Sequence, residues 1–179
     1  LPGRRKMNRQ QGFTLIELMI TIAVLVVLLG IAVPSFTDML RNGRVTSLTN
    51  EIVGALQMAR SEALRRNATV VFCRADAAQT ACAGVLGGTG SYANGWIVHD
   101  KATPTNVLRR TAAPVTVSSV DTVTGPNLIE FNARGNADEG IAGADIVIAV
   151  QLKGCKSNER REIRVLPSGS IVTQRVNCL

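Results

Sequence analysis

The stretch Gly12–Pro34, GFTLIELMITIAVLVVLLGIAVP, decides the fold class of this 179-residue chain. Between Phe13 and Val33 it runs for 21 residues with one charged side chain, Glu17. As a helix it spans roughly 30 Å, the hydrocarbon thickness of a bilayer. Four basic residues precede it, and by the positive-inside rule they keep the N-terminus cytoplasmic: Arg4, Arg5, Lys6 and Arg9. The stretch therefore predicts a membrane helix with the rest of the chain on the outer side.

A helical pattern continues past this apolar stretch. A cleavable signal peptide shares the order of basic and then apolar residues, but its apolar region has only about 7–15 residues and ends in a small-residue cleavage site. Here apolar side chains recur at spacings of three and four, which mark one helix face: Val45, Leu48, Ile52, Ala55, Leu56, Ala59 and Ala63. We therefore predict one helix from about Phe13 to about Arg66. Pro34 lacks a backbone donor and is expected to bend or loosen it.

After Asn67 the pattern changes to short runs rich in Val, Ile and Thr, bounded by turn residues. The predicted strands are Thr69–Arg74, Gly95–His99, Asn106–Thr111, Val115–Val120, Leu128–Asn132, Ile146–Leu152, Glu162–Leu166 and Ser170–Val176. No helix of comparable strength intervenes, so the strands should be mostly antiparallel. Pro167–Gly169 is typical of a turn that joins the last two strands into a hairpin. The predicted fold class is α+β, a long N-terminal helix packed on a mostly antiparallel β-sheet domain.

These patterns divide the chain into a basic leader (1–12), a transmembrane part of the helix (13–33), an amphipathic part (34–66) and a β-rich domain (67–179). Apolar residues make up 46% of the chain but aromatic residues only 3%, so the core must depend on aliphatic side chains. The formal net charge is +7. Since four of the basic residues lie in the leader, this charge does not by itself indicate a nucleic-acid surface.

The four cysteines, Cys73, Cys82, Cys155 and Cys178, all lie in the part of the chain that is predicted to be exported. An even number of cysteines in an oxidising compartment predicts two disulfides. Three connectivities are open, and we expect the simplest, in which sequence neighbours pair. A metal site is not expected, because no two cysteines have metal-ligand spacing and His99 is the only histidine.

The leader and the apolar stretch, QQGFTLIELMITIAVLVVLLGIAVP, resemble the N-terminus of type IV pilins and type II secretion pseudopilins. The resemblance implies that prepilin peptidase cuts between Gly12 and Phe13 and that Phe13 becomes the N-methylated first residue. It also implies that Glu17, the fifth residue after the cut, is the assembly glutamate and that Pro34 is the helix-loosening proline. A start at Met7 would leave the leader MNRQQG, of ordinary length for this family.

The position of Glu17 can also be considered on chemical grounds. A charged carboxylate in the middle of a bilayer costs at least about 2.5–3.5 kcal/mol on insertion scales, and such acids are usually paired and functional. An alternative is that Glu17 lies near enough to the cytoplasmic interface to reach water. Cutting after Gly12, however, creates an amino group four residues away. That group could pair with Glu17 in the same subunit or in a neighbouring one.

Three segments of the body also resemble the FimT, FimU and GspH group of minor pilins and pseudopilins: QMARSEALRRNATVVFCR, NGWIVHDK and IEFNARGNA. The resemblance implies a minor pilin in the tip or initiation complex of a type IV pilus, with GspH-like function in type II secretion as an alternative. It implies as partners prepilin peptidase, other major and minor pilins and, before assembly, the lipid of the bacterial inner membrane. The implied location is a single-pass inner-membrane protein with a periplasmic domain, and later the filament at the cell surface.

A second alternative is a DNA-binding minor pilin for natural transformation. Some FimT-like pilins share a C-terminal Gly-Arg-x-Arg motif, but here Ser170 and Val172 stand where the arginines would be. A basic group remains near the C-terminus: Lys153, Lys156, Arg160, Arg161, Arg164 and Arg175. Such a group could bind phosphates non-specifically, but no aromatic residue follows Phe131 to stack on bases. We therefore favour a solvated set of charges at a strand edge over a DNA site.

An enzyme is not expected. The glycines of Gly84–Gly90 lack the Lys-Ser/Thr of a P-loop and no helix follows them. His99, in a predicted strand, is better explained as a packing or surface residue than as a base, and four bridged cysteines leave no nucleophile. No cofactor is predicted.

Overall fold

The computed structural model describes residues 12–85, 88, 90–112, 120–124, 127–138, 145–151, 155 and 159–178; for 120–124 and for Pro34 it describes the backbone only. The chain forms two compact units, Leu1–Leu40 and Arg41–Leu179.

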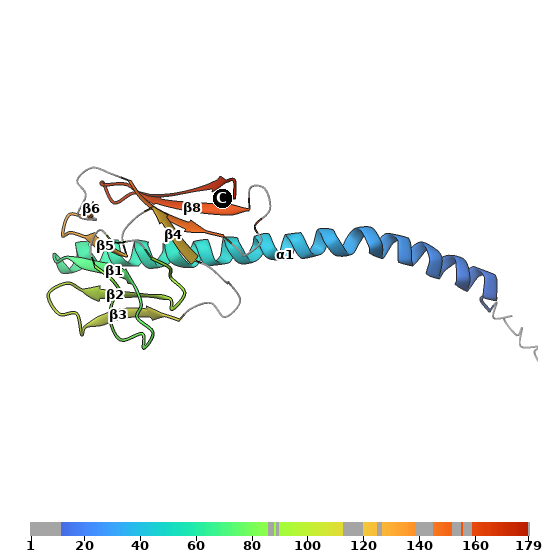
Figure 1. The fold of residues 1–179 in the computed structure, drawn as a ribbon, viewed down its shortest axis with the longest axis horizontal. Coiled ribbons are helices and arrows are strands. Elements are labelled where there is room, and N and C mark those ends of the chain that lie inside the picture. The colour runs from blue at the N-terminus through green and yellow to red at the C-terminus, as the bar shows by residue number, and fades with distance from the viewer. Residues whose placement is uncertain are drawn as a thin grey trace, which may run out of the picture. The chain divides into compact units, whose positions relative to one another are not determined.

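A single helix, α1 (Leu15–Arg66), accounts for 52 residues. It begins two residues after the predicted start, ends where predicted and continues through Pro34 and Gly43 (Figure 1). The Thr14 hydroxyl accepts a hydrogen bond from the Glu17 amide at 3.3 Å. Thr14 therefore caps the helix, with Glu17 at the third helical position, as in a capping box.

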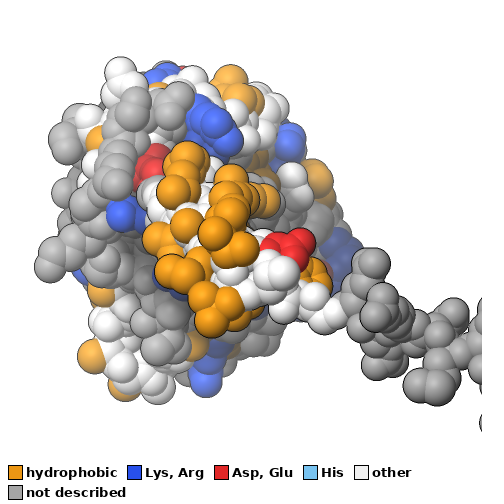
Figure 2. Space-filling view, turned by 90° about the vertical axis from the view of Figure 1, so that its right-hand side faces the viewer, with side chains coloured by type: hydrophobic (Ala, Val, Ile, Leu, Met, Phe, Trp, Pro, Cys, Tyr) orange, Lys and Arg blue, Asp and Glu red, His pale blue; other side chains and the backbone are white. Residues whose placement is uncertain are grey.

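The part of α1 that belongs to the first unit exposes nearly all of its apolar side chains. From Leu15 to Val33 the large ones are 49–76% exposed. Hydrophobic side chains gather over this half of the helix in the space-filling view (Figure 2). By length and composition this is the one helix among the described residues that could cross a membrane.

The part of α1 that belongs to the second unit is buried along one face. All seven predicted core positions, from Val45 to Ala63, are at most 3% exposed. Thr49 is also buried on this face, and its hydroxyl donates to the Val45 carbonyl at 2.7 Å. The prediction of an amphipathic second half is confirmed.

Two antiparallel sheets complete the second unit. The first has the order β3-β2-β1-β5-β6, with β1 Val70–Arg74, β2 Trp96–Asp100, β3 Val107–Thr111, β5 Leu128–Phe131 and β6 Ala137–Asp138. The second has the order β4-β7-β8-β9, with β4 Val120–Thr124, β7 Ile146–Val150, β8 Arg160–Val165 and β9 Ile171–Val176. In the view of Figure 1, β2 and β3 are drawn on one side of α1 and β8 and β9 on the other, and the helix packs in one cluster with both sheets. The structure confirms the α+β class and the antiparallel pairing.

Most predicted strands are present, with ends that differ by one or two residues. The predicted strand Glu162–Leu166 was set too late, because β8 begins at Arg160. Arg160 and Arg161, which precede the predicted start, thus belong to the strand. Residues 115–119 of the predicted strand Val115–Val120 lie outside the described residues, and β4 begins where that prediction ended. The two-residue strand β6 was not predicted.

The main core joins the helix to both sheets. Ile52 and Leu56 of α1 pack in one cluster with Phe72 of β1, Ile148 of β7 and Ile163 of β8. The four aromatic residues of this unit, Phe72, Tyr92, Trp96 and Phe131, are fully buried in it. The few aromatic residues thus lie at the centre of a core that is otherwise aliphatic.

Candidate functional site

The processing and assembly segment begins before the helix. Gly12 and Phe13 precede α1 and are exposed, Phe13 to 81%. Glu17 lies in the first turn, also exposed, four residues after Phe13. A cut after Gly12 would create a new amino group on Phe13, one residue before the cap Thr14 and four residues before Glu17.

Both disulfides follow the neighbour pairing. Cys73 bonds Cys82 with 5.6 Å between their Cα atoms, and Cys155 bonds Cys178 with 5.9 Å. The first bond ties β1 to the loop that follows it, where Ala75 and Cys82 form an isolated β-bridge. The sequence left three connectivities open, and the return of this loop alongside β1 brings Cys82 to Cys73.

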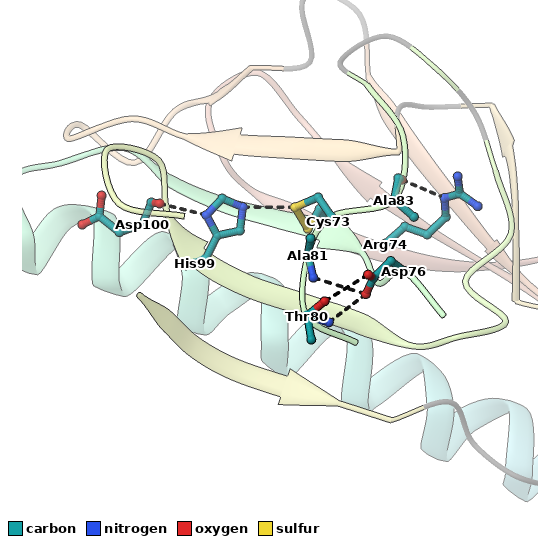
Figure 3. The surroundings of a disulfide bond; sticks show 9 residues. Cys73, Arg74, Asp76, Thr80, Ala81, Ala83, His99 and Asp100 are labelled. Carbon is teal, nitrogen blue, oxygen red and sulfur yellow. Dashed lines mark hydrogen bonds between the residues drawn. A yellow bond between two sulfur atoms is a disulfide. The ribbon is translucent and has the colours of Figure 1, made fainter. Parts of the chain in front are cut away.

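The loop between Cys73 and Cys82 is held by Asp76 (Figure 3). One carboxylate oxygen accepts from the amides of Thr80 at 2.7 Å and Ala81 at 3.2 Å, and the other accepts from the Thr80 hydroxyl at 3.1 Å. The amides of Ala81 and Thr80 lower the pKa of Asp76, because they stabilise its charged form. Arg74 holds the far side of the loop by donating to the Ala83 carbonyl at 3.2 Å.

His99 is buried beside this disulfide. Its side chain is 7% exposed, Nε2 lies 3.0 Å from Cys82 Sγ and Nδ1 lies 2.8 Å from the Asp100 carbonyl (Figure 3). The sequence separated His99 from Cys73 by 26 positions. The β1–β2 register pairs Val71 with His99 and Cys73 with Ile97, so that Cys73 and His99 are diagonal neighbours on one sheet face.

Two members of the basic group near the C-terminus, Arg160 and Arg161, are not the solvated strand-edge charges that the sequence suggested. Arg160 is 4% and Arg161 7% exposed, because β8 is an inner strand between β7 and β9. Arg160 donates to Glu162 at 2.8 Å. Burial, followed by the charge of Arg175, lowers the pKa of Arg161. These two residues do not offer their charges to a phosphate backbone.

The remaining members of the basic group differ in their surroundings. Arg164 lies 3.4 Å from Glu162 and 3.9 Å from Asp145, and Arg175 is exposed on the edge strand β9. Lys153 and Lys156 lie outside the described residues. Among the described residues, the structure therefore does not form the continuous basic surface that a DNA site requires.

Sequence reasoning missed a contact between two turns. The turn Asn132–Gly135 after β5 meets the turn Pro167–Gly169 between β8 and β9, and the Ala137 amide donates to the Pro167 carbonyl at 3.0 Å. Arg60 of α1 donates to the Ser168 carbonyl at 3.1 Å. We call this meeting of the two turns the two-turn contact. It links both sheets and the helix. The glycines in NARGNA and LPSGS were visible in the sequence, but nothing there placed one turn against the other.

The C-terminal end of α1 carries an ion-pair network that yields a pH prediction. Hydrogen bonds from Arg65 (2.6 Å) and Arg66 (2.7 Å) lower the pKa of Glu62 from an ordinary value of 4.5 to about 2. A depressed carboxyl pKa stabilises the fold above the ordinary value, and this stabilisation is lost as pH falls through the folded value. We therefore expect Glu62→Gln to lower the melting temperature slightly at neutral pH and progressively less as the pH falls toward and below about 2.

Thermal unfolding across this pH range tests the expectation, with the exposed Glu51→Gln as the control. A difference between Glu62→Gln and the wild type that does not shrink as the pH falls contradicts it.

Comparison with known proteins identifies the family. The model of the Type II transport protein GspH family matches residues 48–169, more than half of the chain. The chain belongs to this family. The model of the prokaryotic N-terminal methylation motif matches residues 7–33. Together the two place the chain among the type IV pilins and pseudopilins with a GspH domain.

Similar proteins agree with this assignment. The chain is 46% identical to the type IV major alpha-pilin of Moraxella bovis over 46 residues. This match covers 26% of this chain and 29% of the relative. It is 37% identical to a fimbrial protein of Moraxella nonliquefaciens over 94 residues. This match covers 52% of this chain and 58% of the relative. The matches thus span less than two thirds of these relatives.

A solved structure has the same fold. The chain superposes on the crystal structure of the type IV minor pilin FimU of Pseudomonas aeruginosa with a TM-score of 0.53 and 17% sequence identity. The superposition covers 72% of this chain and 91% of that one. This likeness shows a shared fold. Proteins of the pilin family are structural and lack catalytic activity, which agrees with the expectation that this GspH-family chain is not an enzyme.

Proposed function

We propose that this GspH-family chain is a minor pilin of a type IV pilus. One observation carries the proposal: a single helix exposes its apolar side chains from Leu15 to Val33 and buries a different apolar face from Val45 to Ala63 in its own domain. The second face holds the domain. The first has no such role among the described residues, and it suits first lipid and then the helices of other pilins.

The proposed sequence of events starts in the inner membrane. The basic leader (1–12) stays cytoplasmic, residues 13–33 lie in the lipid, and the second unit with its two disulfides lies in the oxidising periplasm. Prepilin peptidase removes the leader after Gly12, and Phe13 becomes the N-methylated first residue. The subunit then leaves the lipid and joins a filament beside major and minor pilins.

Glu17 has two roles to distinguish. In the uncut chain it occupies the third position of a helix that Thr14 caps, where a carboxylate also favours the positive end of the helix dipole. After cleavage it can pair with the amino group of Phe13 on its own or a neighbouring chain. In the low-dielectric core of a helical bundle such a pair is far more favourable than an isolated carboxylate. Glutamine would satisfy the first role but not the second.

This difference defines the experiment. We expect Glu17→Gln and Glu17→Ala to be processed at Gly12 like the wild type, because the cleavage site is unchanged. Both should be depleted at least about tenfold from purified filaments, since a lost pairing of only about 1.4 kcal/mol already shifts incorporation tenfold. Glu51→Gln, an exposed glutamate of the same helix, is the matched control and should incorporate normally.

Immunoblots of membranes and of sheared filaments measure both steps. Normal incorporation of Glu17→Gln together with depletion of Glu17→Ala would assign Glu17 to helix capping alone. Normal incorporation of both variants would remove the assembly role.

We also propose a position at the tip or initiation complex of the pilus. Support comes from the fold shared with the type IV minor pilin FimU, whereas membership of the Type II transport protein GspH family favours a pseudopilin of type II secretion. Deleting the chain separates the two functions: loss of surface pili with normal protein secretion supports the pilus, and the reverse supports secretion. Co-purification with other minor pilins in few copies per filament tests the tip position.

A further inference from the structure

A second, smaller apolar cluster lies on the opposite face of β1 and β2 from the main core. It contains Val71, Cys73, Ala75 and Ile97, with Cys82 packed against it. His99 belongs to the same strand face as Ile97. Metal-ligating atoms of Cys73, Cys82 and His99 all lie within 4.8 Å of one another. The two sulfurs are bonded to each other here. Once reduction separates them, Zn–S and Zn–N bonds of about 2.3 and 2.0–2.1 Å allow all three atoms to surround one ion within this limit.

The His99 ring is oriented as in a metal ligand. Its Nδ1 is 2.8 Å from the Asp100 carbonyl oxygen, which can only accept, so Nδ1 carries the proton and donates it. Nε2 then holds a free lone pair, directed at Cys82 Sγ from 3.0 Å. Metal-ligating histidines usually donate the other ring nitrogen to a backbone carbonyl or carboxylate in this way, which fixes the tautomer and the ring.

A cleft leads to this group of atoms. It has a volume of about 340 Å³ and is lined by Cys82 and His99 together with apolar side chains such as Ile97, Pro104 and Leu128. Cys73 is fully buried behind them. The cleft gives a reductant and an ion access from the side of Cys82, and it leaves room for water as a fourth ligand. Three protein ligands and one water form a common arrangement for Zn²⁺.

We propose that the Cys73–Cys82 disulfide and His99 form a redox-gated Zn²⁺ site, closed by oxidation and opened by reduction. In the oxidised chain the two sulfurs are bonded to each other and are not thiolates. A dithiol reductant of the oxidoreductase class supplies two electrons and two protons: its own sulfurs become a disulfide, and Cys73 and Cys82 become thiols. Zn²⁺ then displaces the two thiol protons, and neutral His99 contributes Nε2. Two thiolates balance the charge of the ion, as a buried site requires.

The second disulfide of the chain serves as a control for zinc binding at the first. Cys155–Cys178 is the other disulfide, and His99, the only histidine of the chain, already faces Cys82. Reduction of Cys155–Cys178 therefore yields two thiols without the imidazole. The proposal predicts that zinc affinity follows the first disulfide and not the second.

The experiment uses the full chain in detergent, reduced with a phosphine that is then removed without oxygen. We expect the reduced protein to bind one Zn²⁺ in competition with a chromophoric chelator, and Co²⁺ to give thiolate charge-transfer bands and the intense d–d bands of tetrahedral coordination. The oxidised protein should bind at least about 100-fold more weakly. His99→Gln, which keeps a polar side chain of similar size, should lose at least about 10–100-fold in affinity, because losing a ligand costs no less than losing its supporting partner.

The cysteine variants decide the location. Cys155→Ser/Cys178→Ser should retain the site and Cys73→Ser/Cys82→Ser should lose it. The single tryptophan, Trp96, is fully buried and reports the fold after reduction through its emission. Equal binding by the oxidised chain, by His99→Gln or by Cys73→Ser/Cys82→Ser overturns the proposal. Loss of the buried Trp96 emission on reduction does so too, since the site requires a folded reduced domain.

Discussion

Replacing Gly169 by alanine should strongly destabilise the β-rich domain. Gly169 has φ +76°, in the left-handed region that favours glycine, and a Cβ there would overlap the Gly135 carbonyl oxygen. Left-handed backbone costs a non-glycine residue about 1–2 kcal/mol and overpacking about 1–3 kcal/mol more. We therefore expect Gly169→Ala to lower the free energy of unfolding by about 2–5 kcal/mol.

A control substitution, Gly54→Ala, should change the free energy of unfolding in the opposite direction. Gly54 lies inside α1, and a Cβ there would meet nothing within 4 Å. Alanine is favoured over glycine within a helix by about 0.5–1 kcal/mol, so Gly54→Ala should stabilise the domain by that amount. Denaturant unfolding followed by Trp96 fluorescence measures both. A loss below about 1 kcal/mol for Gly169→Ala would show that the two-turn contact yields easily.

The second large effect on stability is expected from a leucine in the C-terminal half of α1 and not from one in its N-terminal half. Leu56 is fully buried between the sheets, whereas Leu28 is 59% exposed. Leu56→Ala leaves a cavity in the main core and should cost about 2–5 kcal/mol of domain stability. Leu28→Ala should leave domain unfolding unchanged, because its side chain is exposed and is not part of that core cluster. Under the proposed function its effect appears in membrane retention or filament assembly instead.

The same denaturant titration compares the two leucine variants. Equal destabilisation by both would mean that the N-terminal half of the helix contributes to the domain core. A Leu56→Ala cost below about 1 kcal/mol would mean that the helix face is not the main support of the sheets.

Helix α1 was predictable because its signals are local. A run of apolar residues and a three-to-four spacing of Val45 to Ala63 each depend only on helix geometry, so the buried face followed from sequence. The start of β8 was missed for the opposite reason. Charged residues such as Arg160 and Arg161 usually lie in solvent. Here both lie in an inner strand between β7 and β9, and Glu162 is the ion-pair partner of Arg160.

The disulfide region was predictable in part. An even set of cysteines predicted bonds, and the pairing of neighbours proved to be the arrangement in the structure. The proximity of His99 was hidden, because it arises from the register of β1 against β2 over 26 positions of sequence. Residues distant in sequence become neighbours only when strands pair, and spacing rules for metal ligands do not apply to them.

The sequence alone determined the parts of this protein that lie along one continuous stretch: the apolar helix and the buried face from Val45 to Ala63 that follows it. Those features follow from hydrophobicity and from the 3.6-residue period of the helix, which need no partner from elsewhere in the chain. Only the tertiary structure decided the division into two sheets, the burial of Arg160 and Arg161, the two-turn contact and the meeting of His99 with Cys82. Each of these depends on contacts between segments far apart in the chain, which packing selects.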